Sequence, residues 1–375
     1  MKRSTLELLR DPISGHPLEL EVFAEGDGEI EAGLLTNETR WYPIIDGVPR
    51  LLQGAFREDY SAFVKQHDLE DRLGLEPTHN GDATTQVETN KTFSDKWSRF
   101  KNYGFEEEHR QFLGGWFVKK FGLKSESDLP GFYKSMKSIL EIGPGSGFNT
   151  AFMADHCAGP VLSVDISEAA ITTHNNVRTL TNTHVVQADL MAIPARNDSF
   201  DFAIADGVLH HTPDTRAAVE AVYKKVRPGG RFFFYIYKQM GAARRFCDAH
   251  LREHLSPMAP EACYEACEGI TELGRELSNL NAKITLTKGI PQLGIPAGEH
   301  DVQRLLYYNF IKCFWNDAFD QETNNMVNFD WYHPHDAWQH TEDEVHGWLA
   351  EMGVKDYQIN DANPNGISVL LTKPA

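Results

Sequence analysis

The chain has 375 residues, of which 41% are hydrophobic and 24% charged, as is typical of a folded protein with a substantial core. Its formal net charge of −18 repels phosphate backbones and anionic lipids, which disfavours binding to nucleic acid or membrane surfaces. No apolar stretch approaches the roughly 18 residues that a membrane span needs. The first residues lack a signal-peptide core, and the five cysteines match no metal-site spacing, so we expect a cytoplasmic protein.

Residues 1–54 predict a small β-rich unit. Short apolar runs alternate there with glycine and proline, as they do in β-hairpins. Residues 55–137 predict a helical linker that ends in an aromatic-rich segment containing Phe93, Trp97 and Phe100. We expect this aromatic segment to act as a lid over a ligand site.

From residue 138 onward, strand patterns alternate with helix patterns. The predicted strands of residues 138–239 are "SILEIG", "VLSVDIS", "THVVQADL", "FDFAIADGVL" and "RFFFYIY". Such alternation predicts an α/β fold with a doubly wound, mostly parallel sheet. Residues 240–335 interrupt it with a mainly helical insertion, which we expect to form the substrate pocket. Residues 336–375 then complete the core with a helix, capped by Thr341 and Glu344, and a closing strand.

A glycine-rich turn follows the first of these strands. Gly143, Gly145 and Gly147 have the spacing G-x-G-x-G, whereas the dinucleotide fingerprint is G-x-G-x-x-G, with Phe148 where its third glycine would be. This spacing disfavours a dinucleotide oxidoreductase. Glu141 lies in the strand, two residues before the first glycine.

Carboxylates end the next two strands. Asp165 ends the second strand, where it could accept hydrogen bonds from both hydroxyls of a ribose. Asp189 ends the third, where it could accept from an adenine amino group while Ile166 and Leu190 cover the ring. Open α/β sheets bind ligands just beyond these strand ends, so the sequence predicts a nucleoside site there.

The order of the motifs "LEIGPGSG", "VDIS", "QADL", "FDFAIADGVLHH" and "VRPGGRFFF" resembles the class I S-adenosylmethionine-dependent methyltransferases. The resemblance covers residues 138–237 and the closing strand near 366–373. It implies a seven-stranded sheet and S-adenosylmethionine as the cofactor, with Asp206 near the methionyl amine or the substrate entrance. The residues that it implies for cofactor binding are Glu141, Gly143, Gly145, Gly147, Asp165, Ile166, Asp189, Leu190 and Asp206.

The N-terminal segments "LLRDPISGHPLEL" and "GLLTNETRWYPIIDGVPRLL" resemble the two halves of a small zinc-ribbon domain. The paired cysteines of that family are replaced here by Asp11 and Ser14 in one half and by Thr36 and Thr39 in the other. Without thiolates we expect the ribbon fold without a metal, in a structural or docking role.

Two histidines follow the fourth strand. We expect His210 and His211 to lie beside the transferred methyl group as candidate bases, the alternative being that they pack under the next helix. Of Tyr235 and Tyr237, which leave the fifth strand, we expect at most one to reach the site.

The segment "FDWYHPHDAWQHT" supplies two further candidate catalytic residues, Tyr332 and His340. We expect this segment to fold over the pocket and shape the substrate cavity. Metal binding is an alternative, because three histidines lie near Asp330 and Asp336, but their spacing matches no known ligand pattern.

The leading hypothesis is therefore a methyltransferase that transfers the methyl group in line to a small-molecule acceptor. One alternative is attack on the γ-carbon of the same cofactor, by cyclisation or aminocarboxypropyl transfer, which would release methylthioadenosine. Another is a non-catalytic binding protein of the same fold. The sequence leaves the acceptor and the oligomeric state open.

Overall fold

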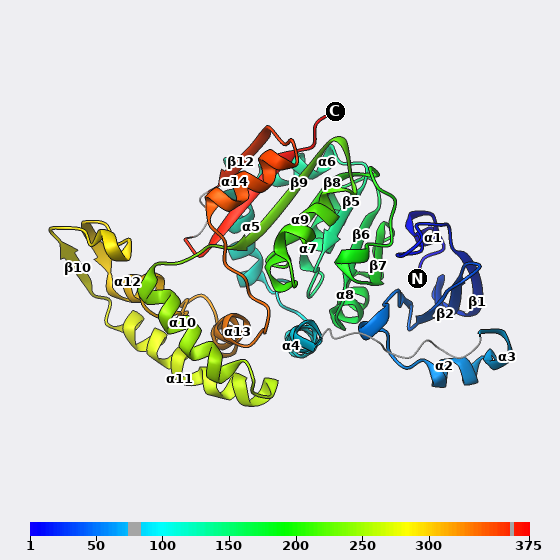
Figure 1. Ribbon diagram of the computed structural model, residues 1–375, viewed down its shortest axis with the longest axis horizontal. Coiled ribbons are helices and arrows are strands. Elements are labelled where there is room, and N and C mark those ends of the chain that lie inside the picture. The colour runs from blue at the N-terminus through cyan, green and yellow to red at the C-terminus, as the bar shows by residue number, and fades with distance from the viewer. Residues whose placement is uncertain (74–83, 361–363) are drawn as a thin grey trace.

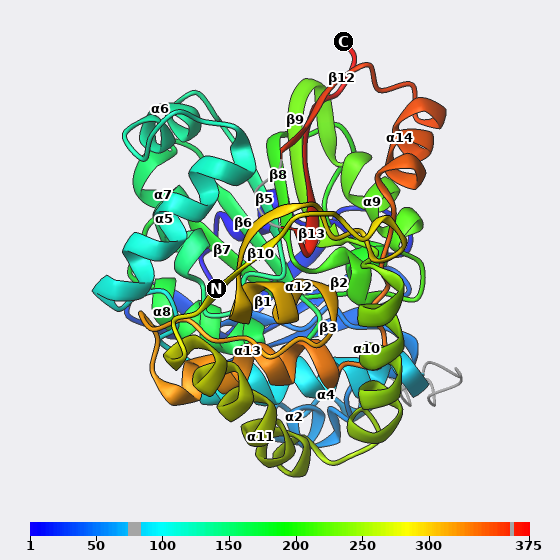
Figure 2. The same cartoon turned by 90° about the vertical axis from the view of Figure 1, so that its left-hand side faces the viewer.

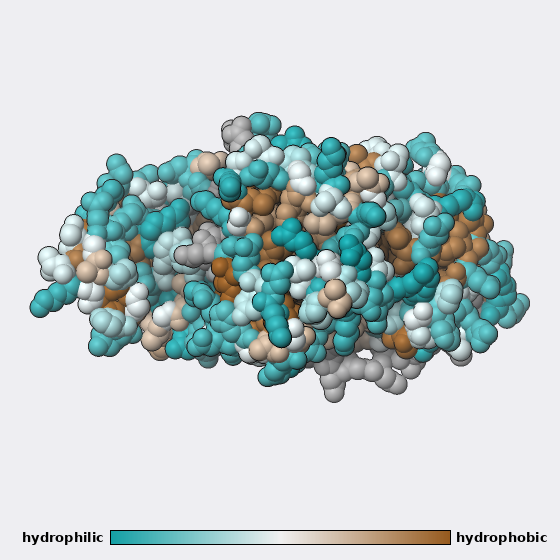
Figure 3. Space-filling model, turned by 90° about the horizontal axis from the view of Figure 1, so that it is seen from above, coloured by the Kyte–Doolittle hydropathy of each residue, from teal (hydrophilic) through white to brown (hydrophobic). Residues whose placement is uncertain are grey.

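The computed structural model describes residues 1–73, 84–360 and 364–375. A central sheet with its helices lies between the N-terminal unit on one side and a helical insertion on the other (Figure 1). None of the described helices combines the length and the apolar character that crossing a membrane requires. Hydrophilic residues spread over much of the upper face, where hydrophobic residues form separate groups (Figure 3).

The central sheet has seven strands in the order β12-β13-β9-β8-β5-β6-β7. The strands are β5 (Ile139–Ile142), β6 (Val161–Asp165), β7 (Thr183–Gln187), β8 (Phe200–Asp206), β9 (Val226–Tyr237), β12 (Asp356–Asn360) and β13 (Gly366–Thr372). Strand β13 runs in the direction opposite to the other six strands. The predicted doubly wound, mostly parallel sheet is confirmed, while the edge strand β12 was missed because it is short and half-exposed.

Alternate residues of the strands pack on opposite faces of the sheet. In β9, Phe232 and Phe234 join one apolar cluster, whereas Phe233 and Tyr235 join the other. The first cluster includes residues of the N-terminal unit, α9 (Thr215–Tyr223) and α14 (Glu342–Glu351). The second includes residues of α5 (Glu107–Phe121), α6 (Asp128–Lys134), α7 (Phe148–His156) and the insertion. Burial on both faces explains the nearly continuous apolar strand sequences.

The N-terminal unit, residues 1–57, carries a four-stranded antiparallel sheet. Its elements are α1 (Thr5–Leu8), β1 (Glu19–Gly26), β2 (Glu29–Thr36), β3 (Trp41–Ile45), β4 (Val48–Pro49) and the 3₁₀ turn η1 (Gly54–Phe56). Arg50, just after β4, forms a parallel bridge with Gln187 at the end of β7. The unit thus covers the edge strand of the central sheet, which would otherwise expose unpaired backbone groups.

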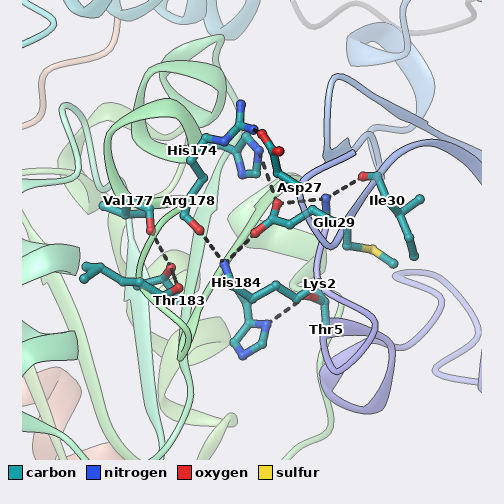
Figure 4. A network of polar contacts seen from close by, with 12 residues as sticks. Lys2, Thr5, Asp27, Glu29, Ile30, His174, Val177, Arg178, Thr183 and His184 are labelled. Carbon is teal, nitrogen blue, oxygen red and sulfur yellow. Dashed lines mark hydrogen bonds and ion pairs between the residues drawn. The ribbon is translucent and has the colours of Figure 1, made fainter. Parts of the chain in front are cut away.

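Buried polar contacts join this unit to the core (Figure 4). Lys2 Nζ donates to the carbonyl of Arg178 in the core at 3.2 Å and is held within the unit by Glu29 Oε1 at 2.8 Å. Thr5 Oγ1 lies 2.8 Å from His184 Nδ1 on β7. These contacts fix the unit on the core, in addition to the backbone pairing.

Hydrogen bonds close the two turns of the N-terminal unit. In the first, Asp11 Oδ1 accepts from the Ser14 amide at 2.6 Å, and the buried Tyr42 hydroxyl donates to Asp11 Oδ2 at 2.7 Å. In the second, Asn37 Oδ1 accepts from the amides of Thr39 and Arg40 at 2.9 and 2.8 Å. Side-chain oxygens that cap backbone amides are a standard way to stabilise such turns.

Helices connect these parts. Before the core come α2 (Ser61–Gln66), α3 (Glu70–Leu73) and α4 (Thr84–Arg99), followed by α5 and α6, and within the core lies α8 (Ala169–Val177). The insertion contains α10 (Ala242–Leu255), α11 (Pro260–Asn279), β10 (Lys283–Leu286), η4 (Pro291–Leu293), β11 (Gly298–Asp301), α12 (Val302–Asn309) and α13 (Gln321–Tyr332). Helix α13 lies between α11 and α4 (Figure 1) and contacts both of them. Seen from the side in Figure 2, these helices lie below the central sheet. The insertion also packs on the sheet directly, since Trp331 lies against Tyr237 of β9.

We expect the Asp11→Ala variant to lose about 2 kcal/mol of unfolding free energy, because it removes a buried acceptor of several hydrogen bonds. Chemical denaturation measures the loss, with Arg3→Ala, a change at an exposed ion pair, as the control. EDTA should leave the wild-type midpoint unchanged. A midpoint that falls in EDTA would show that a metal supports the fold.

Candidate functional site

A cavity of about 530 Å³ opens at the carboxyl ends of the parallel strands. Its floor is formed by residues at the ends of β5, β6, β7, β8 and β9. Residues of helices α4 and α5 line other parts of its wall. This size lies within the range of small-molecule sites, and its position is the one where open α/β sheets bind ligands.

The glycine turn forms the predicted tight backbone. Gly143, Gly145 and Gly147 all have positive φ, at 68°, 61° and 87°. A Cβ atom on Gly145 would lie 2.6 Å from the ring of Trp97, so this glycine admits the helix α4 that covers the turn. Of the three, only Gly143 lines the cavity. Gly145 and Gly147 instead allow other parts of the chain to pack closely against the turn, a role that the sequence did not predict.

Glu141 lies below the cavity and does not line it, contrary to the implied role. It is buried, and it accepts hydrogen bonds from the hydroxyls of Thr150 and Ser163. Burial raises the pKa of Glu141 to about 7 despite these two hydrogen bonds. Its place is in the packing between β5, β6 and α7.

Asp165 and Asp189 line the cavity from the ends of neighbouring strands, together with Ile166 and Leu190. Asp165 Oδ1 accepts from the amide and hydroxyl of Ser167, and Asp189 Oδ1 accepts from the Met191 amide. Burial raises the pKa of Asp165 to about 6 and also raises the pKa of Asp189. Among the described residues, neither carboxylate has an ion-pair partner, so a ligand that donates hydrogen bonds would offset their burial.

Asp206, at the end of β8, lines the cavity in an ion pair that the sequence did not predict. Lys120 Nζ on α5 lies 2.5 Å from Asp206 Oδ1, and its ammonium lies over the rings of Trp116 and Tyr235 at 4.7 and 4.4 Å. Burial lowers the pKa of Lys120. Nothing in the sequence of this helix indicated that Lys120 would belong to the site.

His211 is the only one of the four candidate catalytic residues that lines the cavity. Its Nδ1 lies 2.6 Å from the carbonyl oxygen of Asp336. Since a carbonyl can only accept, Nδ1 carries the hydrogen and Nε2 keeps its lone pair. Burial lowers the pKa of His211 to about 4, and the buried Nε2 has no hydrogen-bond partner among the described residues.

The other three candidates serve the packing. The ring of His210 is fully buried against Tyr237, with centroids 3.7 Å apart. The Tyr332 hydroxyl donates to the Lys312 carbonyl at 3.0 Å, and the backbone of His340 pairs with that of β9. None of the three lines the cavity. His210 and His211 are neighbours in the 3₁₀ turn after β8, and only His211 faces the cavity.

Tyr235 and Tyr237 both line the cavity, so the expectation of at most one was wrong. Residues two apart in a strand point to the same face. Helix α4 contributes Phe93 and Trp97 to the wall, whereas Phe100 packs in the core beyond it. Movement of α4 as a lid stays a prediction.

Helix α4 also carries polar cavity residues that the sequence reading missed. Gln86, Asn90, Phe93 and Trp97 recur at helical spacing and line the cavity together, a periodicity that could have been detected. Gln86 Nε2 donates to the His211 carbonyl at 3.2 Å, and its buried Oε1 has no partner among the described residues.

The insertion contributes one described residue, Asp330, to the cavity wall, fewer than its predicted role as the substrate pocket requires. Asp330 Oδ1 lies 2.9 Å from Lys96 Nζ on α4. The segment after α13 instead holds other walls in place. The Asp336 amide donates to Thr89 Oγ1 at 3.0 Å, and the Trp338 amide donates to the His210 carbonyl at 3.0 Å.

The histidine-rich segment forms no group of metal ligands among the described residues. His333 is occupied by Thr92 at 2.7 Å and by the Met258 carbonyl at 3.0 Å. The described chain has one cluster with suitable ligand atoms within 4.8 Å of one another, formed by the exposed His250, Glu253 and His254 on α10. None of these three residues lines the cavity.

Residues 140–234 match the family model described as "Methyltransferase domain". The core is a class I methyltransferase domain. In the chain order of the core strands, its sheet reads 3-2-1-4-5-7-6, with the seventh strand antiparallel. This domain confirms the resemblance that the motifs indicated, and S-adenosylmethionine is the cofactor of its family.

Curated relatives of the methyltransferase domain include ubiquinone biosynthesis O-methyltransferases. The one from Hydrogenovibrio crunogenus is 30% identical over 102 residues, which are 26% of this chain and 42% of the relative. The one from Coxiella burnetii is 23% identical over 194 residues, 48% of this chain and 78% of the relative. The chain thus spans about two fifths of the first relative's length.

Among solved structures, the N-methyltransferase NodS from Bradyrhizobium japonicum WM9, in complex with S-adenosylhomocysteine, is 13% identical. The match covers 77% of this chain and 100% of NodS, with a TM-score of 0.39.

We expect Glu141→Gln to gain stability over the wild type as the pH rises. The pKa of Glu141 is about 7 in the folded domain, against an ordinary value of 4.5 for a glutamate. Between these two pH values the folded state therefore retains a proton that the unfolded chain releases. The free energy of unfolding of the wild type should therefore fall relative to the variant by about 2 kcal/mol between pH 5 and pH 8. Chemical denaturation of both proteins at the two pH values measures this. A difference that is constant with pH would contradict the assignment.

Proposed function

We propose that the chain is an S-adenosylmethionine-dependent methyltransferase that acts on an uncharged small molecule bearing a hydroxyl group. The observation that carries the proposal is a pair of cavity carboxylates at the ends of neighbouring strands, the buried Asp165 and the half-buried Asp189, without cationic partners among the described residues. When bound, the cofactor supplies a methyl group made electrophilic by its positively charged sulfur.

The cavity residues fit such a cofactor. Asp165 would accept hydrogen bonds from the ribose hydroxyls and Asp189 from the adenine amino group. Lys120 and Asp206 form an ion pair complementary to the carboxylate and ammonium of a methionyl group. The faces of aromatic residues in the wall favour a nearby positive charge.

His211 is the residue suited to take a proton from the acceptor. Its Nδ1 is held by the Asp336 carbonyl, which fixes the ring and presents the lone pair of Nε2. Transfer would form a bond between the acceptor oxygen and the methyl carbon and break the methyl–sulfur bond, with S-adenosylhomocysteine as the leaving group, and Nε2 would take the proton of the acceptor hydroxyl. Asp330 is a nearby negative charge that favours the resulting imidazolium.

The charges of the wall favour an uncharged acceptor. Two cationic side chains line the described cavity, Lys96 and Lys120, and each is already paired with an aspartate. An anionic acceptor would have to break one of these pairs. Gln86 Oε1 and His211 Nε2 are buried acceptors without partners among the described residues, so they favour a ligand that brings O–H donors.

The first test is the binding of S-adenosylhomocysteine, measured by isothermal titration calorimetry. We expect the wild type to bind it and Asp165→Ala to bind it about 100-fold more weakly, because two hydrogen bonds to a carboxylate are lost. Asp155→Ala, a change at an exposed position of α7, is the control. Equal affinity in wild type and Asp165→Ala would refute the assignment of the site.

The second test supplies methyl-labelled S-adenosylmethionine with matched phenols, amines and carboxylic acids. Label should pass to a phenol with release of S-adenosylhomocysteine, whereas methylthioadenosine would reveal attack on the γ-carbon. His211→Asn retains a donor for the Asp336 carbonyl but lacks the second nitrogen. It should slow transfer roughly 100-fold or more while leaving S-adenosylhomocysteine affinity unchanged. Undiminished transfer would exclude His211 as the proton acceptor.

A further inference from the structure

We propose that the N-terminal unit is part of the nucleoside-binding site and that Arg50 positions the residues around the adenine. This inference rests on the proposed function, because it concerns the same cavity. The ribbon-like sequence predicted only a structural or docking role, without a link to the ligand.

A chain of hydrogen bonds runs from the N-terminal unit to the cavity wall. Arg50 Nη1 donates to Gln187 Oε1 at 2.5 Å, and Gln187 Nε2 donates to the carbonyl of Ile166 at 3.2 Å. Arg50 and Gln187 are 5% and 2% exposed, so water cannot readily replace either partner. Ile166 lines the cavity directly after Asp165.

The N-terminal unit also holds both ends of the segment that carries Asp189. At one end, the Leu51 amide donates to the Gln187 carbonyl at 2.8 Å, two residues before Asp189. At the other end, the Arg10 amide donates to the Pro194 carbonyl at 2.9 Å. The cavity residues Asp189, Leu190 and Met191 therefore lie in a short segment fixed at both ends by residues of this unit.

The unit contributes to the wall directly as well. Phe56, in the turn η1 that follows Arg50, lines the same cavity as Met191. A site formed from side chains of rigid elements holds a ligand more accurately than a free loop does. The N-terminal unit thus both covers the edge of β7 and supports the adenine side of the cavity.

The test compares two probes, S-adenosylhomocysteine and S-inosylhomocysteine, which has an oxygen in place of the adenine amino group. With Asp189 held in place, the wild type should prefer the adenine compound about tenfold or more. Arg50→Met should lower the affinity for S-adenosylhomocysteine about tenfold and reduce the preference to about twofold. A variant that folds normally but no longer discriminates between the two compounds would show that Arg50 positions the adenine site and does not merely stabilise the fold.

Two further variants and one control complete the test. Gln187→Glu retains an acceptor for Arg50 but loses the donor to Ile166, so it should also reduce the preference, and it decides the question if Arg50→Met does not fold. Arg50→Lys should restore part of the preference. Arg3→Met, which breaks an exposed ion pair with Glu25, should change neither affinity.

The outcomes separate the two proposals. A wild type that binds neither compound would refute the proposed function. A wild type that binds S-adenosylhomocysteine, together with folded Arg50→Met and Gln187→Glu variants of unchanged affinity and preference, would refute only the role of the N-terminal unit.

Discussion

The structure depends on one constraint, the burial of polar side chains at one edge of the central sheet. Five parallel strands end at this edge, and polar side chains gather there beyond the apolar core. Asp165, Asp189 and Asp206 all follow strands that are buried along their length. A buried carboxylate is costly unless it gains hydrogen bonds or a cation. Asp206 has Lys120, whereas the other two have only neighbouring amides and hydroxyls, which leaves binding capacity for a ligand.

The other parts of the chain complete the walls around this edge. Helix α4 covers the glycine turn with Trp97 and faces the strand ends with Phe93. The segment after α13 forms hydrogen bonds with both α4 and the turn after β8 through Asp336, so this segment holds His211 and α4 in place. The N-terminal unit closes the β7 side. Three regions distant in the sequence therefore support one cavity.

Side-chain oxygens hold the turns of the N-terminal unit. Asp11 and Asn37 each accept hydrogen bonds from backbone amides of the turn that follows them. Backbone pairing of Arg50 with Gln187 then couples this unit to β7 of the core.

The sequence by itself determined the sheet and the carboxylates at its edge, because both depend on local patterns. A buried strand is a short apolar run, and its end is marked by the polar residue that follows the run. It could not determine which of His210, His211, Tyr332 and His340 would reach the cavity. That choice depends on the direction of side chains in one 3₁₀ turn and on a segment 125 residues away whose carbonyl holds His211. Lys120 was likewise unpredictable as a site residue, and the helical periodicity of Gln86, Asn90, Phe93 and Trp97 shows a shared face but not that this face borders the sheet edge. Only tertiary packing decides this, because a helix sequence shows which face is apolar but not what lies opposite its polar residues.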